Sequence, residues 1–144
     1  MRIRKSVGAF IVNRSGKILL LKTRGMTRIY WDILKGGVKE GETLLGTLKR
    51  EIKEELGTEK IGEIKKLNLN FTFKFPERIR RRINFDGERV ELFLVEFIGD
   101  EKDIKVDGKE ILGFKFVDKD EFKRKATYRK TIEAFEELIK RFKV

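Results

Sequence analysis

The sequence predicts an α/β fold in which a mixed β-sheet is sandwiched between α-helices. Residues 67–75 alternate large apolar side chains with Asn, Thr and Lys, the two-residue period of a strand with one buried face. Residues 43–56 and 126–143 instead space their apolar side chains three and four positions apart, as amphipathic helices do. No repeat, low-complexity stretch or linker interrupts the chain, so we expect a single domain over residues 1–144.

Turn residues and apolar runs place the remaining elements. Asn and Gly at 13–16 separate the apolar runs 6–12 and 17–22, which predicts a β-hairpin. Pro76 is expected to end the strand 67–75, because proline cannot donate to a sheet. Three further runs are expected to be strands: 60–66, 89–97 and 110–117. Three polar or mixed stretches are expected to be loops: 23–33, 77–82 and 99–108.

Composition limits the chemistry that the chain can perform. It contains no cysteine and no histidine, which excludes disulfides, thiolate or imidazole zinc sites and histidine general bases. Catalysis would therefore rest on carboxylates, Lys, Arg or Tyr, and on metal ions held by carboxylates. No apolar run approaches the ~18 residues that span a membrane, and the first residues lead straight into a strand-like segment. We therefore expect a cytoplasmic protein without a membrane partner.

The net charge of +11 indicates polyanionic partners such as nucleotides, polyphosphates or RNA. However, charged residues make up 41% of the chain and glutamine is absent, which is also typical of proteins from hyperthermophiles. The high lysine content can thus reflect either a high growth temperature or the binding of a polyanionic ligand. Only clustered arginines therefore indicate a function.

The predicted helix 43–56 carries three carboxylates on one side. Glu51, Glu54 and Glu55 are neighbours on a helical surface, where like charges repel unless a cation lies between them. Hard divalent cations such as Mg²⁺ bind through carboxylates, so the ridge is a candidate metal site. The alternative is a solvated face neutralised by the neighbouring Lys and Arg side chains. Four apolar residues are expected to face the core instead: Leu45, Leu48, Ile52 and Leu56.

The spacing around this ridge resembles the signature of the Nudix hydrolase family. Gly36, Glu42 and the run Arg50-Glu51-Ile52-x-Glu54-Glu55-x-Gly57 stand at the positions of that motif. The one strict departure is Thr58, where the motif prefers a large apolar residue. The resemblance implies a Nudix-like fold and hydrolysis of a diphosphate linked to a nucleoside or a similar group.

The resemblance also implies roles for the residues of the motif. Arg50 would orient the carboxylates, since it can pair with Glu54. A loop carbonyl, that of Gly36, would add a contact to the metal, and Glu42 would brace the loop or bind metal. The catalytic Mg²⁺ or Mn²⁺ would be held mainly by three carboxylates: Glu51, Glu54 and Glu55.

Outside the motif, the chain resembles the RNA pyrophosphohydrolase and dinucleoside-polyphosphate branch of the family. The resembling segments are residues 30–33, 75–79, 110–116 and 124–130. In that branch a glutamate just before the penultimate strand is a further metal ligand or general base. Glu110 holds this position here. The alternatives for the same role are Glu91, Glu96 and Glu101. Three basic residues match contacts to phosphates and nucleobase: Arg4, Arg24 and Arg124.

Two classes of function remain open on the sequence alone. The intact acidic triplet favours a metal-dependent pyrophosphohydrolase. Its substrate would be a nucleoside polyphosphate, a dinucleoside polyphosphate or a 5′-triphosphorylated RNA end, and its general base would be Glu55 or Glu110. Within this class, an ADP-ribose hydrolase is the alternative. The other class is a nucleic-acid-binding module on a catalytically silent fold. The basic run 78–82 either grips a polyanion or is solvated, and the phenylalanines of 67–75 are expected to be core rather than a base-stacking platform. The oligomeric state stays open.

Overall fold

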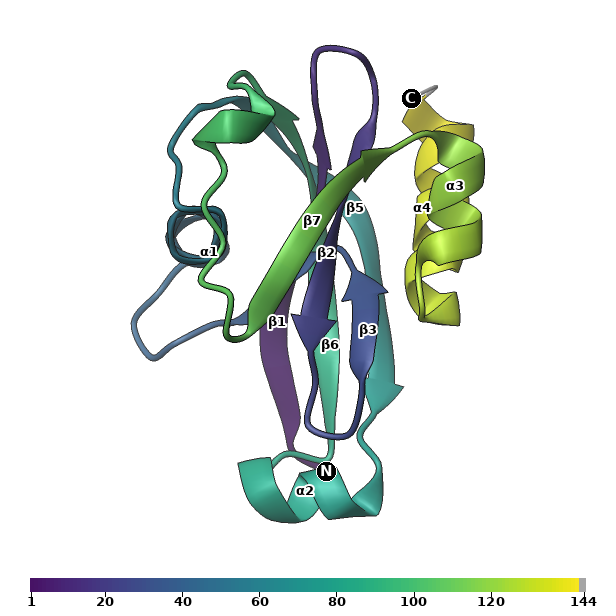
Figure 1. Ribbon diagram of the computed structural model, residues 1–144. Coiled ribbons are helices and arrows are strands. Elements are labelled where there is room, and N and C mark those ends of the chain that lie inside the picture. The colour runs from purple at the N-terminus through teal and green to yellow at the C-terminus, as the bar shows by residue number, and fades with distance from the viewer. Residues whose placement is uncertain (143–144) are drawn as a thin grey trace.

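The computed structural model describes residues 1–142, and it confirms the predicted α/β class. A seven-stranded mixed sheet forms the middle layer. Helix α1 (Leu44–Leu56) covers one side of this sheet, and α3 (Lys119–Lys125) and α4 (Arg129–Phe142) cover the other (Figure 1).

The sheet has the strand order β3-β2-β1-β6-β5, with β4 paired to β1 and β7 paired to β2. Among the strands of residues 1–142, only β1 and β6 are parallel neighbours, and the other pairs are antiparallel. The strands are β1 (Ile3–Val12), β2 (Ile18–Arg24), β3 (Ile29–Asp32), β4 (Leu34–Gly37), β5 (Ile61–Lys74), β6 (Gly87–Phe97) and β7 (Ile111–Val117). A short helix α2 (Glu77–Ile83) joins β5 to β6, and a 3₁₀ turn η1 (Glu101–Asp103) precedes β7.

The central strand β1 sends its side chains alternately into two cores. Val7 and Ile11 pack toward α1, whereas Phe10 packs among the buried residues of α3 and α4. The Phe122 ring of α3 lies 4.1 Å from the Phe135 ring of α4, centroid to centroid, and both are fully buried. Burying a side chain of this size stabilises the fold by about 1.5–3 kcal/mol. The phenylalanines therefore hold both helices on the sheet.

Helix α1 has the ends that its sequence predicts. The Thr43 side chain accepts a hydrogen bond from the Gly46 amide and so caps the first turn. Gly57 ends the helix in the left-handed region at φ 63°, and its amide donates to the Lys53 carbonyl. The expectation that Leu45 faces the core is wrong, because its side chain is 44% exposed.

Two helices stand where none was expected. Residues 77–82, expected to be a loop, lie in α2, whose Ile79 and Ile83 are half-buried while none of its residues is fully buried. Helix α3 begins where the Asp118 side chain accepts from the backbone amide three residues later, and it buries Phe122. Both helices are only two turns long, so neither repeats its apolar spacing often enough to be recognised in the sequence.

Two strand boundaries also differ from those expected. The stretch 23–33, expected to be a loop, contains β3, which pairs with β2 from Leu21↔Asp32 to Arg24↔Ile29. The separate strands predicted over 60–66 and 67–75 are one strand, β5. Its register against β6 shifts between Lys66 and Asn70, at the point where the sequence pattern changes.

The C-terminal helix α4 begins at Arg129 rather than at residue 126. Thr127 is held to the sheet instead, because its amide donates to the Trp31 carbonyl and its hydroxyl accepts from the Trp31 amide. Residue 143 of the predicted helix lies outside the described residues. Within residues 1–142, no helix has the length and apolar character needed to cross a membrane.

Candidate active site

The glycine loop lies directly on the acidic side of α1. Strand β4 pairs with β1, placing Gly36 opposite Val7. A Cβ atom on Gly36 would stand 2.2 Å from Cδ of Glu51, so no larger residue fits without moving that carboxylate. The glycine thus lets the loop backbone approach the carboxylate ridge.

Arg50 joins this loop to the helix. Its Nε and Nη2 donate to the two oxygens of Glu42, at 2.7 and 3.0 Å, and Nη2 also donates to the Gly37 carbonyl at 3.0 Å. Its Nη1 donates to Glu51 at 2.8 Å and to Glu54 at 3.2 Å. The expected contact with Glu54 is therefore present, but the shorter bonds run to Glu42 and Glu51.

Glu42 has the contacts of a bracing residue. Besides Arg50, its carboxylate accepts hydrogen bonds from the Lys39 amide at 2.8 Å and the Thr47 hydroxyl at 3.0 Å. These bonds, that of Arg50 first, lower the pKa of Glu42 to about 2. Because donors of the protein occupy both oxygens, the geometry favours the structural role for Glu42 over metal binding.

Glu55 is the least satisfied carboxylate of the ridge. Its Oε2 atom is buried and has no hydrogen-bond partner within residues 1–142. Burial, and then the negative charges of Glu51 and Glu110, raise the pKa of Glu55 to about 9. A buried carboxylate oxygen with like-charged neighbours and no donor is stabilised by a cation, so the site fits a metal ion.

The other two carboxylates of the ridge differ in exposure. Glu51 is buried and burial raises its pKa, whereas the Glu54 side chain is 55% exposed. Across residues 1–142, no three acidic side chains already converge as a metal cage. Mg²⁺ uses one or two carboxylates together with water and substrate phosphates, so a partly assembled set of oxygens suits it.

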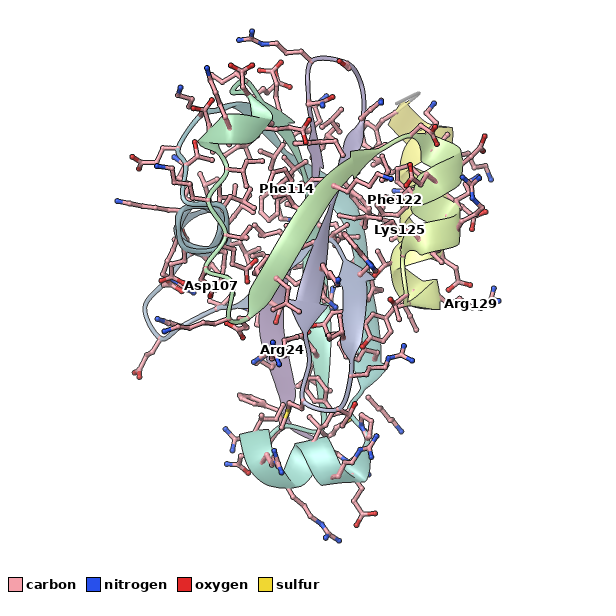
Figure 2. The ribbon with its side chains drawn as sticks, viewed as in Figure 1. Arg24, Asp107, Phe114, Phe122, Lys125 and Arg129 are labelled. Atoms are coloured by element: carbon pink, nitrogen blue, oxygen red, sulfur yellow. The ribbon has the colours of Figure 1, made fainter. Side chains whose placement is uncertain are left out.

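Glu110 lies close enough to the Glu55 carboxylate for its charge to raise the pKa of Glu55. It immediately precedes β7, and its backbone carbonyl accepts from the Arg24 amide at 2.8 Å. Asp107, which the sequence analysis missed, accepts from the backbone amides of residues 109, 110 and 111 and so fixes the segment. Asp107 and Arg24 both lie near the start of β7 in Figure 2. The Asp-x-x-Glu spacing was the available signal for this turn.

A cavity of about 720 Å³ opens beside these carboxylates. Glu55 and Glu110 both line it, and so do the predicted basic residues Arg4 and Arg24. The alternatives to Glu110, namely Glu91, Glu96 and Glu101, are not among its lining residues.

The three predicted arginines have different surroundings. Arg4 donates to Glu88 at 2.7 Å through Nε, and Arg24 donates through Nε to the Lys109 carbonyl at 3.1 Å. Arg124 is an exposed residue of α3 and does not line the cavity. The structure thus brings Arg4 and Arg24 together with the carboxylates and leaves Arg124 apart.

Lys35 is a cationic residue of the cavity that the sequence analysis missed. Its Nζ lies 2.8 Å from Asp32, whose other oxygen accepts from the Thr131 hydroxyl at 2.9 Å. Burial lowers the pKa of Lys35, but Asp32 outweighs it and the pKa is raised overall. The ammonium also faces the rings of Phe73 and Tyr128, at 5.2 and 5.6 Å from their centroids. An Asp and a Lys three residues apart beside the glycine loop were the available signal.

The phenylalanines of β5 combine both roles considered for them. Phe71 and Phe73 are half-buried and pack against the core under α3 and α4, which agrees with the core interpretation. However, Phe71, Phe73 and Phe75 also line the cavity, so their outer faces are available to a ligand.

Comparison with known proteins identifies the family of the chain. The family described as NUDIX domain matches residues 2–138. An RNA pyrophosphohydrolase of Wolbachia pipientis subsp. Culex pipiens is 30% identical over 149 aligned positions, covering 95% of this chain and 91% of its own length. An RNA pyrophosphohydrolase of Bartonella henselae is 31% identical over 113 positions, covering 72% and 65%.

Two solved structures share the fold at low identity. The E. coli dihydroneopterin triphosphate pyrophosphohydrolase superposes with a TM-score of 0.76 at 19% identity, covering 96% of this chain and 98% of its own. A C. elegans Ap4A hydrolase gives a TM-score of 0.70 at 21% identity, covering 97% and 100%. Together with the family match, these results confirm the resemblance in the sequence. The chain belongs to the NUDIX domain family, as a hydrolase of phosphoric anhydrides.

Proposed function

We propose that the chain is a divalent-metal-dependent pyrophosphohydrolase whose substrate is a nucleoside polyphosphate, a dinucleoside polyphosphate or a 5′-triphosphorylated RNA end. The observation that carries this proposal is the buried Oε2 atom of Glu55, which has no hydrogen-bond partner among residues 1–142 and lies beside Glu51 and Glu110 at a cavity lined elsewhere by cations and aromatic rings. The names of the relatives, RNA pyrophosphohydrolase and Ap4A hydrolase, support the substrate class.

The metal-binding residues would be the ridge and the groups that face it. The oxygens would come from Glu51, Glu54, Glu55, Glu110 and the carbonyl of Gly36. When bound, Mg²⁺ or Mn²⁺ supplies neutralisation of phosphate charge and a more acidic water. Arg50 keeps the glycine loop against the helix, so the carbonyl and carboxylate donors hold their relative positions.

The chain's own residues would then direct the hydrolysis. A water oxygen forms a bond to phosphorus, the bridging P–O bond breaks, and the bridging oxygen leaves with the departing phosphate. A carboxylate takes the proton that the water loses. Glu110 suits this role, since its side chain makes no ion pair or hydrogen bond with the rest of residues 1–142. Glu55 is the alternative base.

Cations and rings of the cavity would hold the substrate. Arg4, Arg24 and Lys35 offer positive charge to the phosphates that are not being cleaved. Tyr30 and Tyr128, whose centroids are 5.2 Å apart, offer apolar faces to a nucleobase. The cavity volume lies in the range of about 300–1,000 Å³ usual for small-ligand sites.

The test is the release of phosphate-containing cleavage products, separated by anion-exchange chromatography, from a panel of nucleoside triphosphates, dinucleoside polyphosphates, 5′-triphosphorylated RNA and ADP-ribose. We expect release with Mg²⁺ or Mn²⁺ and none with excess chelator. Absence of release from every substrate, in a protein that binds RNA, would favour a catalytically silent binding module instead. Preferred cleavage of ADP-ribose would keep the enzyme class and overturn the substrate class.

A further inference from the structure

Helix α2 carries a cluster of arginines that the proposed reaction does not use. Its sequence contains four arginines and one glutamate, and only Arg81 has an acidic partner, Glu77 at 2.8 Å. Within residues 1–142, Arg78, Arg80 and Arg82 make no ion pair and no side-chain hydrogen bond. Side chains with nitrogen tips surround this helix in Figure 2. Their charge is therefore available to an external anion.

The position of α2 connects these arginines with the cavity. Ile79 and Ile83, four residues apart, are half-buried and line the cavity, and Arg78 lines it too. Arg82 follows Arg78 by one turn, so the two arginines share a side of the helix. Because α2 has no fully buried residue, core packing does not account for its presence.

A row of aromatic rings leads along the cavity to α2. On β5 the Phe71 ring lies 6.1 Å from that of Phe73, and Phe73 lies 5.4 Å from Phe75, centroid to centroid. Lys35 faces the first two rings of the row, its Nζ lying 5.9 Å from the Phe71 centroid and 5.2 Å from the Phe73 centroid. The row ends beside Pro76, where α2 begins. Rings and unpaired cations thus follow one another from the cavity to the surface.

We propose that this surface, Phe71, Phe73, Phe75 and the arginines of α2, binds the first nucleotides of a single-stranded RNA whose 5′ end occupies the cavity. The inference rests on the proposed function and selects the RNA end among its substrates. Single-stranded nucleic acid is bound where a cationic groove follows its backbone and aromatic rings stack with its bases. Guanidinium groups pair well with phosphodiester oxygens, and unpaired arginines need break no internal ion pair to do so.

Length separates this substrate from a nucleotide. A mononucleotide held in the cavity has no phosphates beyond it, so Arg80 and Arg82, which do not line the cavity, would contribute little. A longer RNA places phosphodiesters beside them. The inference therefore predicts that affinity rises with RNA length and that this increase depends on α2.

The hairpin turn between β1 and β2 supplies a matched control. Arg14 and Lys17 are exposed there and lie at the opposite end of the sheet from α2 (Figure 1). Replacing both by alanine removes two positive charges, as many as replacing Arg80 and Arg82 removes. The two double variants therefore differ in where charge is lost, not in how much.

The experiment measures fluorescence anisotropy of labelled, 5′-triphosphorylated RNA in chelator, so that no hydrolysis occurs, across a salt series. The wild type should bind an octanucleotide at least about tenfold more tightly than a dinucleotide at low salt. In Arg80→Ala/Arg82→Ala most of that advantage should disappear. The slope of log affinity against log salt should fall by about 1.4, since each lost contact with a single strand contributes about 0.7. Arg14→Ala/Lys17→Ala should behave as the wild type.

Equal binding of the two RNA lengths by the wild type would overturn the inference. Equal losses in the two double variants would also overturn it, because net charge rather than the α2 surface would then be responsible. Release of cleavage products from the whole substrate panel by the wild type is measured in parallel, with metal present. Release of products without length-dependent binding means that the inference fails and the proposed function stands. Length-dependent binding without release from any substrate means that the α2 surface binds RNA and the proposed hydrolysis is wrong.

Discussion

Arg50 of α1 donates to both carboxylate oxygens of Glu42, through Nε at 2.7 Å and Nη2 at 3.0 Å. This pair closes the glycine loop onto the helix, because the same guanidinium also donates to Gly37 in the loop and to Glu51 in the ridge. The position of the carboxylate ridge relative to the loop carbonyls therefore depends on one planar group.

Arg50→Lys keeps the positive charge but removes the paired hydrogen bonds of the guanidinium, so it tests whether those bonds position the carboxylates. An ammonium cannot make the same paired bonds, so we expect kcat to fall about 10–100-fold, as for other residues that orient metal ligands. The free energy of unfolding, measured with urea, should fall by about 1–3 kcal/mol. The control is Arg141→Lys, whose ion pair with Glu137 lies at the surface, with side chains 46% and 37% exposed, and should contribute less than about 1 kcal/mol. Equal, small effects of both substitutions would refute the clamping role.

Gly36→Ala should damage the site through geometry alone. The new methyl group would stand 2.2 Å from Cδ of Glu51, so either that carboxylate or the loop must move. We expect most phosphate release to disappear while circular dichroism still reports a folded protein. Gly113→Ala is the matched control, since a Cβ there meets nothing within 4 Å and the φ of Gly113 is not positive. Full activity of Gly36→Ala would contradict the tight contact of loop and ridge.

The metal-free protein should lose stability as the pH rises. The pKa of Glu55 is about 9 in the fold, against 4.5 for an ordinary glutamate, so between these values the folded state holds a proton that the unfolded chain releases. The unfolding free energy therefore falls through this window, and the loss is complete above about pH 9. Glu55→Gln has no such proton and should lack this part of the slope.

Thermal unfolding in chelator between about pH 5 and pH 9 measures this difference. Glu55→Gln should gain stability relative to the wild type as the pH increases, and added Mg²⁺ should raise the melting temperature of the wild type most at high pH. If the difference in melting temperature between the wild type and Glu55→Gln did not change with pH, Glu55 would have an ordinary pKa and the prediction would be wrong.

The Asp32–Lys35 pair predicts non-additive mutations. Lys35→Met leaves the Asp32 carboxylate, which is 1% exposed, without its cation and should cost about 3–5 kcal/mol of stability. Adding Asp32→Asn should restore much of that stability, because no buried charge remains unpaired. The KM should be above that of the wild type in both the single and the double variant, since the cation facing the substrate is absent from both. Recovery of both properties together would assign Lys35 a purely structural role.

Local signals in the sequence account for the part of the site that was predicted. Thr43 and Gly57 mark the ends of α1 through contacts within four residues, and the spacing from Gly36 to Glu55 preserves the loop and ridge as one motif. The alternation of 67–75 likewise fixes a strand by itself. Such features need no knowledge of distant contacts.

Long-range contacts account for what was missed. Asp32 orients Lys35 with help from Thr131, 99 residues further along the chain, and no local pattern announces that bond. Helix α2 places Ile79 and Ile83 in the lining of the cavity, while its run of arginines is locally indistinguishable from a solvated loop. The linear resemblance predicts Arg124 as a substrate contact from its position alone, whereas helix α3, which was not expected, places it outside the cavity lining.

The central claim is that Glu51, Glu54, Glu55 and Glu110 bind a divalent ion that hydrolysis requires. Release of phosphate or pyrophosphate from a 5′-triphosphorylated dinucleotide, titrated with Mg²⁺, tests it most directly in wild type, Glu55→Gln and the control Glu136→Gln, whose side chain is exposed. We predict saturable activation by metal in wild type and control, complete inhibition by chelator, and a loss of at least about 100-fold in folded Glu55→Gln. Release that persists in chelator, or near-normal turnover by Glu55→Gln, would contradict the account.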